Sequence, residues 1–318
     1  MTIRTKVSVV GVLVVLLGAT ISYITHVRAV AYSIMPHGVV YPVRTSEAER
    51  GRLRRMGDSL LPEQRFDTTF AQRTDDSTTI VVRHIRPVNV PNPRGLVVIV
   101  HGISSCKEVG LFAAARLLEK QYEVVVYDQR GHGESSGTTC TYGYRESQDL
   151  VLILQNVVQR RSLPIVLWGN SMGAATVILA AERLQRVGIP PSCVIAESGY
   201  SDFTSLVADF TEQRMGYRLP GIGSILADTV GRLLNFSPDS IRPVESLARI
   251  QCPVILLHGT ADTRVPIDHG RRLAEALHGK HTKSSYIEFV GAGHTDLASV
   301  NPRLYADAIS AGFNIIGR

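Results

Sequence analysis

Residues 168–175 read WGNSMGAA and join an apolar run to an alanine-rich stretch of helical composition. The apolar run, Pro164–Trp168, is typical of a strand buried on both faces of a parallel sheet. The five residues Gly169–Gly173 have the form Gly-x-Ser-x-Gly. Between a strand and a helix, this pattern predicts a sharp turn that lifts the hydroxyl of Ser171 clear of the sheet, at the positive end of the helix. The stretch therefore predicts an α/β fold and a serine nucleophile together.

The same five-residue pattern occurs a second time, as GESSG at Gly133–Gly137. This copy follows Arg130-Gly131-His132 in a glycine-rich loop, and no helical stretch comes directly after it. Because the bare pattern is weak, its context decides between the two copies. We therefore assign the nucleophile to Ser171. The alternative is that Ser171 merely occupies a tight turn.

Strand-like and helix-like stretches alternate on both sides of the Ser171 turn. Further buried-strand runs are Leu96–Val100, Glu123–Tyr127, Cys193–Ala196, Val254–Leu257 and Ser285–Val290. The helical stretches are Glu108–Lys120, Tyr144–Gln159, Met172–Arg186, Ile267–Leu277 and Asn301–Ile315. Upstream, Phe66–Arg73 and Thr79–Ile85 flank Asp75-Asp76 and predict an antiparallel hairpin. This order predicts an α/β fold with a mostly parallel central sheet and helices on both faces.

A serine nucleophile needs a base, and in such sheets functional groups gather beyond the carboxyl ends of the strands. The last predicted strand leads into Gly291-Ala292-Gly293-His294, so His294 lies on a loop where a base is expected. We predict that His294 is the base. Three other late histidines, His269, His278 and His281, fall within or beside a predicted helix and are interpreted as surface residues.

The acid that orients the base is expected after an intermediate strand, because serine, acid, histidine is the chain order in this type of fold. Asp262 follows such a strand. It would accept the ring proton of His294 and leave the other ring nitrogen facing Ser171. Asp296, two residues past the histidine, suits a helix N-cap better. The competing acids are Glu197, the main rival, Asp202 and Asp296.

A tetrahedral intermediate needs hydrogen-bond donors for its oxyanion. The backbone amide of Met172, directly after the nucleophile, is one predicted donor, and the amide of Ile103, in the loop after Val100, is the other. His101 begins that loop and is interpreted as a brace for it rather than a second base. No His/Cys spacing resembles a metal site, and no glycine-rich phosphate loop opens the first parallel strand. We therefore expect neither a metal nor a cofactor.

Together these pieces resemble the alpha/beta-hydrolase fold superfamily, and its serine-aminopeptidase-like branch in particular. The matching motifs are VIVHGISS at Val98–Ser105, YDQRGHGESSG at Tyr127–Gly137, WGNSMGAA at Trp168–Ala175, CPVILLHGTADTRVP at Cys252–Pro266 and GAGH at Gly291–His294. The resemblance implies a hydrolase domain over residues 66–318 with a small helical cap inserted at about 200–249. It leaves the substrate open, because this scaffold hosts many chemistries. Members with aspartate as the nucleophile open epoxides or remove halogens, and Ser171 argues against both.

Within the implied cap, apolar residues recur at helical spacing and form one face. They are Ile222, Leu226, Val230, Leu233 and Leu234. This face either packs on the body of the domain or lines an acyl pocket, and the sequence leaves both possibilities open.

The N-terminal residues predict a membrane segment. Val7–Ile24 is a run of 18 uncharged residues, preceded by Arg4 and Lys6. A helix of this length can span a bilayer, and the run is longer than the apolar core of most signal peptides. We predict an uncleaved anchor within residues 1–31 and a catalytic domain on the non-cytoplasmic side. A cleaved signal, which leaves a secreted protein, and a buried core helix are the alternatives.

Residues 32–65 are polar and are predicted to be a juxtamembrane linker. A small basic cluster lies within them, formed by Arg50, Arg52, Arg54 and Arg55. We interpret it as a solvated face, with contact to anionic lipid headgroups as the alternative.

The composition narrows the class of protein. The chain has 318 residues, 44% of them apolar, a net charge of +6 and four cysteines, which excludes disorder and a disulfide scaffold. Nucleic acid is not an expected partner, because no domain-wide basic stripe accompanies the charge. In the sheet that the resemblance implies, Cys106 and Cys140 follow neighbouring strands and could pair in an exported protein. Cys193 and Cys252 are expected to be buried thiols.

The predicted function is hydrolysis of carboxylic esters through an acyl-enzyme, with a small ester, a lipid or a short peptide as substrate. A serine peptidase with the same triad is the alternative. We favour the esterase because no acidic clamp for a peptide amino terminus can be assigned in the cap. A non-catalytic binding module is disfavoured, since serine, acid and histidine are all present in the expected order.

Overall fold

The computed structural model describes residues 43–316 except 160, 219 and 278–282, and within them eight strands form one sheet. The strands are β1 (Arg65–Arg73), β2 (Thr79–Pro87), β3 (Leu96–Val100), β4 (Glu123–Tyr127), β5 (Ile165–Asn170), β6 (Cys193–Glu197), β7 (Val254–Gly259) and β8 (Ser285–Phe289). Their order across the sheet is β1-β2-β4-β3-β5-β6-β7-β8. Strand β2 pairs antiparallel with β1 and β4, and every pair from β4 to β8 is parallel. This confirms the predicted α/β fold and its hairpin.

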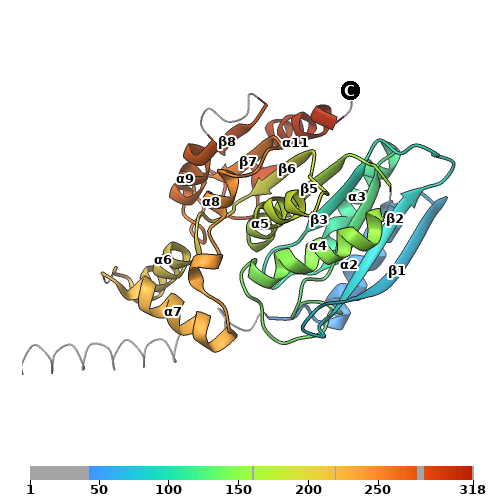
Figure 1. Cartoon of the computed structure of the whole chain (residues 1–318). Coiled ribbons are helices and arrows are strands. Elements are labelled where there is room, and N and C mark those ends of the chain that lie inside the picture. The colour runs from blue at the N-terminus through green and yellow to red at the C-terminus, as the bar shows by residue number, and fades with distance from the viewer. Residues whose placement is uncertain (1–42, 160, 219, 278–282, 317–318) are drawn as a thin grey trace, which may run out of the picture.

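Helices cover both faces of the sheet (Figure 1). The described helices are α2 (Glu47–Leu60), α3 (Leu111–Glu119), α4 (Tyr144–Val158), α5 (Met172–Arg186), α6 (Phe203–Met215), α7 (Ile222–Leu234), α8 (Pro243–Leu247), α9 (Ile267–Leu277), α10 (Leu297–Val300) and α11 (Pro302–Ile316). Short 3-10 helices span Lys107–Gly110 and Pro238–Ser240. The observed ends of the strands and helices whose ranges were predicted differ from the predicted ends by three residues at most.

Two apolar cores form because the valine-rich strands present alternate side chains to opposite faces. Val98 and Val100 belong to the core under α4, α5, α8 and α9. Val97 belongs to the core under α3 and α11. Strands buried in this way on both faces explain the continuous apolar runs in the sequence. The sheet is therefore a rigid support for the loops at its carboxyl edge.

The helices of the insertion, α6, α7 and α8, lie between β6 and β7, and α6 and α7 pack on each other at one end of the molecule (Figure 1). Ile222, Leu226 and Val230 of α7 are buried in a third core with Tyr142 and other residues of the body. The apolar face thus packs on the body. Leu233 does not belong to it, because it is 58% exposed.

The N-terminal anchor predicted within residues 1–31 lies outside the described residues. Among residues 43–316, no described helix is long and apolar enough to cross a membrane. The stretch predicted as a linker, 32–65, contains α2, which packs on α3 where Gly57 meets Leu111. Of its basic cluster, Arg54 pairs with Glu108, a buried residue of the body.

Candidate active site

The turn between β5 and α5 holds Ser171 in a strained conformation. Its φ of 54° and ψ of −117° are rarely adopted by a residue with a side chain. Both flanking glycines are required for this turn. A Cβ on Gly169 would lie 2.2 Å from the carbonyl oxygen of Gly173, and a Cβ on Gly173 would lie 2.2 Å from that of Val100. The Gly-x-Ser-x-Gly pattern therefore permits the close approach of strand and helix that raises the serine.

Ser171, His294 and Asp262 meet in one hydrogen-bonded line at the carboxyl edge of the sheet. The hydroxyl of Ser171 donates to Nε2 of His294 over 2.8 Å. Nδ1 of His294 donates to Oδ2 of Asp262 over 2.7 Å. All three are largely shielded from solvent, with Ser171 8% exposed and Asp262 6% exposed. The structure thus brings together the three residues that the sequence placed on three separate loops.

The environment of Asp262 keeps its carboxyl ionised. Burial by itself would raise the pKa of this group, but hydrogen bonds from His258, His294 and the amide of Val265 hold the pKa well below its usual range. A carboxylate only accepts hydrogen bonds, so Nδ1 of His294 must carry the proton. In the neutral imidazole, Nε2 is then the unprotonated nitrogen that faces Ser171. This tautomer is the one that general-base activation of the serine requires.

Two buried histidines brace the loop after β3. In His101, Nε2 accepts from the amide of Gln129 and Nδ1 donates to the carbonyl of Gly102. In His132, Nε2 accepts from the amide of Ser104 and Nδ1 donates to the carbonyl of Arg130. Burial lowers the pKa of both rings, that of His132 to about 3, so both stay neutral. The bracing interpretation of His101 fits these bonds.

The braced loop lies directly against the serine. A Cβ on Gly102 would lie 3.3 Å from Cβ of Ser171, and Ile103 lines the same cavity as Ser171 and His294. Met172, whose amide is the other predicted oxyanion donor, is buried as the first residue of α5. Both predicted donors therefore belong to segments that flank Ser171. His132 was not singled out from the sequence, although the glycine-rich loop that carries it was noticed.

The rival acids have other partners. Glu197 accepts hydrogen bonds from Nε1 of Trp168 and from the hydroxyl of Tyr305, and burial raises the pKa of its carboxyl. Asp202 caps α6 by accepting from the amide of Ser205. Asp296 stands at the N-cap position of α10, but its side chain accepts from the amide of Gly293 instead of capping the helix.

In the second Gly-x-Ser-x-Gly copy, the serine is buried and holds neighbouring backbone segments together. Ser135 is 1% exposed, and its hydroxyl donates to the carbonyl of Asp128 and accepts from the amide of Val81 in β2. Its hydroxyl is therefore committed to backbone partners. The interpretation that context selects Ser171 is consistent with these contacts.

The interpretation of His269 as a surface residue is wrong, because this ring is completely buried. Nε2 of His269 lies 2.8 Å from a carboxylate oxygen of Asp209 on α6, and Nδ1 lies 2.9 Å from the hydroxyl of Ser201. Asp209 of α6 and Ser201, just before that helix, contact His269 in the first turn of α9, and no local sequence pattern reveals these contacts. His278 and His281 lie outside the described residues.

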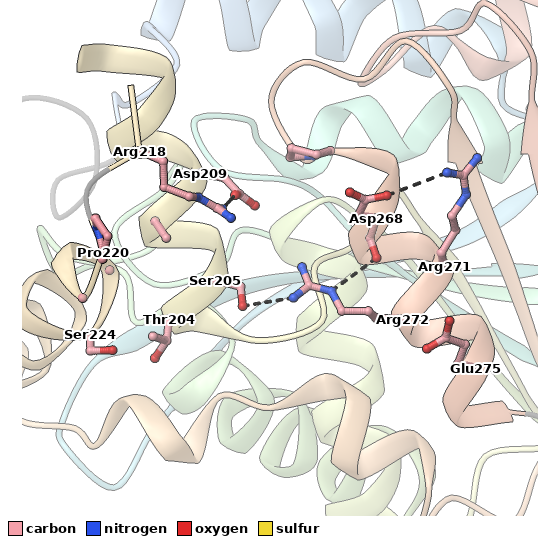
Figure 2. Close-up of a pocket in the computed structure, with 14 residues that line it drawn as sticks. Thr204, Ser205, Asp209, Arg218, Pro220, Ser224, Asp268, Arg271, Arg272 and Glu275 are labelled. Carbon is pink, nitrogen blue, oxygen red and sulfur yellow. Dashed lines mark hydrogen bonds and ion pairs between the residues drawn. The ribbon is translucent and has the colours of Figure 1, made fainter. Parts of the chain in front are cut away.

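A polar cavity of about 640 Å³ adjoins this contact between α6 and α9 (Figure 2). Three arginines line it, and each has partners: Arg218 pairs with Asp209, Arg271 with Glu288, and Arg272 bonds to the hydroxyl of Ser205. Figure 2 shows Arg272 reaching across to Ser205. Arg272 also lies 3.9 Å from a carboxylate oxygen of Asp202, so each of the three guanidinium groups has an acidic partner within the protein.

A larger cavity of about 1120 Å³ opens at Ser171 and His294 and extends between α3 and α11. Apolar residues supply most of its inner surface, and Ile99 and Trp168 of the sheet lie among the residues that line it. Residues of the inserted helices α6 and α7 do not line it, so the apolar face of α7 is not part of this cavity.

The cysteines and potential metal ligands complete the survey of the site. Cys106, Cys140, Cys193 and Cys252 are free and buried, so Cys106 and Cys140 do not pair. The described part of the chain contains no group of three or more His, Cys, Asp or Glu residues arranged to hold a metal ion.

Two family models match consecutive parts of the chain. Residues 91–220 match the model described as serine aminopeptidase, S33, and residues 215–311 match the dienelactone hydrolase family. The first match contains Ser171 and the second contains Asp262 and His294.

Curated relatives include an uncharacterised Bacillus subtilis protein, YqkD, which is 31% identical over 71% of this chain and 72% of its own length. A zebrafish (Danio rerio) protein named lysophosphatidylserine lipase ABHD12 is 28% identical over 53% of this chain. That match spans only 43% of the lipase.

Solved structures share the fold. An esterase of Pyrococcus furiosus superposes with a TM-score of 0.61 and 20% identity, covering 86% of this chain and 97% of the esterase. A puromycin-hydrolysing peptidase of Mycobacterium tuberculosis superposes with a TM-score of 0.58 and 20% identity, covering 79% of this chain and 39% of the peptidase.

Proposed function

The chain belongs to the alpha/beta-hydrolase superfamily, and we propose that it is a serine hydrolase that cleaves carboxylic esters through an acyl-enzyme. In this proposal Ser171 is the nucleophile, His294 the general base and acid, and Asp262 the group that orients the histidine. The amides of Met172 and Ile103 hold the oxyanion.

In the first half of the reaction, Oγ of Ser171 attacks the carbonyl carbon of the ester while Nε2 of His294 takes the hydroxyl proton. The carbonyl oxygen becomes an oxyanion, which the two amides stabilise. The tetrahedral intermediate then expels the alcohol, which leaves with the proton from His294. The acyl group remains bound to Ser171.

In the second half, water attacks the acyl carbon and gives a proton to His294. The second tetrahedral intermediate collapses, the bond to Oγ breaks, and His294 returns the proton to Ser171. The carboxylic acid departs and the enzyme is restored. Each step uses only the residues named and water.

The observation that carries this proposal is the hydrogen-bonded line from Ser171 through His294 to Asp262. A neutral histidine with its proton on Nδ1 is poised to deprotonate a serine, and the ionised Asp262 stabilises the imidazolium that forms. The esterase that shares the fold and the relative named as a lipase are consistent with ester chemistry.

A serine peptidase is the second candidate, favoured by the description of the first family model and by the peptidase that shares the fold. A peptide amino terminus would need a carboxylate near the scissile bond. Among the described residues that line the cavity, the carboxylates are Glu197, which is bonded to Trp168 and Tyr305, and Glu119 at the end of α3. Neither is available beside Ser171 for an ammonium group.

The two candidates are separated by comparing short p-nitrophenyl esters with aminoacyl anilides as substrates of the full chain. We expect ester turnover, and His294→Gln should lower it at least about a thousandfold because the base is lost. Turnover of anilides alone would replace the esterase with the peptidase. Turnover of neither substrate, in a protein that is folded by circular dichroism, would contradict the catalytic proposal.

We further propose that the apolar run Val7–Ile24 tethers the enzyme to a membrane, with the catalytic domain on the non-cytoplasmic side. Its 18 uncharged residues and the preceding Arg4 and Lys6 support this orientation. The full chain should stay with the membrane fraction after an alkaline carbonate wash. Release into the supernatant at full length would contradict the tether, and release of a shortened chain would indicate a cleaved signal.

A further inference from the structure

The cavity between α3 and α11 leaves uncovered a central part of the sheet, which helices normally cover. Ile99 of β3 and Trp168 of β5 are paired neighbours in the middle of the sheet, yet both remain partly exposed. Central parallel strands are normally buried on both faces. Here the two helices on this face leave a groove between them, and Ile99 and Trp168 form its floor.

Residues of α3 and of α11 form the two walls of the groove, and those of α11 share one face of the helix. On α3 the lining residues include Phe112 and Ala113. On α11 they are Tyr305, Ala306, Ile309 and Phe313, at the spacing of a single helix face, with Pro302 and Ser310 beside them. From Pro302 to Phe313 a helix rises about 16 Å, so the lining residues of α11 extend over about that length.

One end of the groove is the proposed catalytic centre. Tyr305 bonds to Glu197 at the carboxyl end of β6, whereas Gly312 packs against Ile195 and Cys193 near the start of that strand. Helix α11 therefore runs from the catalytic edge of the sheet towards its opposite edge. Phe313 stands near the far end, with its ring centroid 6.3 Å from that of Trp168.

The charged residues that line the groove are either exposed outside its floor or already hydrogen-bonded within the protein. Arg116, Glu119 and Lys120 are exposed at its rim. Arg264, two residues past Asp262, also lines the cavity and is exposed. The carboxyl of Glu197 is occupied by Trp168 and Tyr305. An extended peptide would also need partners for its own backbone groups. The walls are helices, which offer no strand edge to such a backbone.

We propose that this groove holds the acyl chain of a long-chain ester while Ser171 attacks its carbonyl carbon. The inference rests on the proposed esterase function and adds the substrate class to it. Continuity with Ser171, an apolar floor and a length of several methylene groups all favour an alkyl chain. Burial of each methylene strengthens binding roughly fourfold, so the groove selects long chains over short ones.

The single tryptophan of the chain, Trp168, gives a direct measure of occupancy without catalysis. A fatty acid with a terminal bromine, such as 11-bromoundecanoate, quenches tryptophan on contact. We expect saturable quenching in the full chain. Ala306→Phe, which fills the groove from an exposed position on α11, should weaken the binding at least about tenfold. Ala311→Phe is the matched control, because Ala311 is an exposed alanine of the same helix outside the groove.

Chain-length profiles test the same groove during turnover. With p-nitrophenyl butyrate, octanoate and laurate, kcat/KM of the wild type should rise with chain length. Ser310→Phe, nearer the far end, should lower kcat/KM at least about tenfold for laurate only. Ala306→Phe, nearer Ser171, should lower it for octanoate and laurate. In both variants the loss for butyrate should be smaller than the loss for laurate, and Ala311→Phe should keep all three values within about twofold of the wild type.

The outcomes separate this inference from the proposed function. Quenching by bromoundecanoate that is absent, or that is unchanged in Ala306→Phe, would overturn the groove as an acyl site, as would equal turnover of all chain lengths. Turnover of butyrate in that case would leave the esterase proposal intact. Conversely, quenching that Ala306→Phe abolishes, without turnover of any ester, would support the acyl groove and contradict the catalysis.

Discussion

The turns Gly169–Gly173 and Gly133–Gly137 share one five-residue pattern but differ in what surrounds the serine. At Ser171 the hydroxyl donates to an imidazole nitrogen, and the backbone adopts a φ of 54° between a strand and a helix. At Ser135 the hydroxyl lies between two backbone groups, the carbonyl of Asp128 just after β4 and the amide of Val81 in β2. The neighbours of the serine, and not the pattern, therefore decide whether its hydroxyl can act as a nucleophile.

The turn at Gly133–Gly137 nevertheless helps to hold the loop that lies beside Ser171. His132, just before it, accepts the amide of Ser104 and so holds the loop that carries Ile103. The guanidinium of Arg44 donates to the carbonyls of Gly133 and Ser135 and ties the same turn to the chain before α2. One turn is proposed to perform the chemistry, and the other shapes the loop beside it.

The largest expected difference in ester turnover between the two turns comes from removing each serine hydroxyl in turn. Ser171→Ala should lower ester turnover by a factor of about 10⁶ and leave the fold intact, because the nucleophile is lost. Ser135→Ala should keep turnover within about tenfold but destabilise the fold by about 1–3 kcal/mol, because buried backbone groups lose a partner. Steady-state kinetics and urea unfolding of both variants measure these effects. Comparable loss of turnover in the two variants would contradict the assignment.

The two buried carboxylates beside Ser171 offer the next contrast. Asp262→Asn should lower kcat by about 10⁴, because an amide no longer fixes the proton on Nδ1 of His294. Glu197→Gln should stay within about tenfold, since its hydrogen bonds from Trp168 and Tyr305 do not reach the histidine. Initial rates with a short ester distinguish them. A larger loss in Glu197→Gln would make Glu197 the orienting acid.

The bracing role of His132 predicts a smaller effect. His132→Gln should lower kcat about tenfold with little change in KM for a short ester, since the loop that carries the Ile103 amide becomes less well ordered. His101→Gln serves as a parallel variant, because His101 braces the same loop from its other side. Unchanged kcat in both variants would show that the oxyanion loop does not depend on these rings.

The smallest expected effect on activity is at Glu123, which begins β4 and therefore lies at the edge of the sheet opposite to the Ser171 turn. It accepts hydrogen bonds from His84 and Arg161, which lower its pKa to about 2 although burial acts in the opposite sense. Because the folded pKa is depressed, this stabilisation is complete above about pH 4.5 and is lost as the pH falls towards 2. Glu123→Gln should therefore lower Tm at pH 7 and flatten its decline below pH 4.5, with turnover unchanged. Parallel Tm profiles of variant and wild type would contradict this.

Much of the fold followed from local patterns. Valine-rich runs such as Leu96–Val100 are determined by burial on both faces, and each one became a strand. Ser171 was predicted from the Gly-x-Ser-x-Gly pattern between a strand and a helix, and His294 and Asp262 from their places after later strands. The structure joins these three side chains by hydrogen bonds. These inferences needed only short motifs and the order of elements along the chain.

The features that could not be predicted from the sequence depend on how elements distant along the chain pack against each other. The burial of His269 arises from α6, which is distant in sequence and supplies Asp209. The groove between α3 and α11 depends on the separation of two helices that share no local motif. Helix α2 packs through Gly57 on Leu111, although its composition is that of a solvated segment. Contacts of this kind become visible only in three dimensions.

The most direct test of the account is to map the residue that a fluorophosphonate modifies in the full chain. Such a probe reacts with a serine whose hydroxyl is activated by a neighbouring base. Peptide mass spectrometry should find one adduct, on Ser171, and none in Ser171→Ala. Modification of Ser135, or equal labelling of wild type and Ser171→Ala, would contradict the central claim that Ser171 is the nucleophile activated by His294.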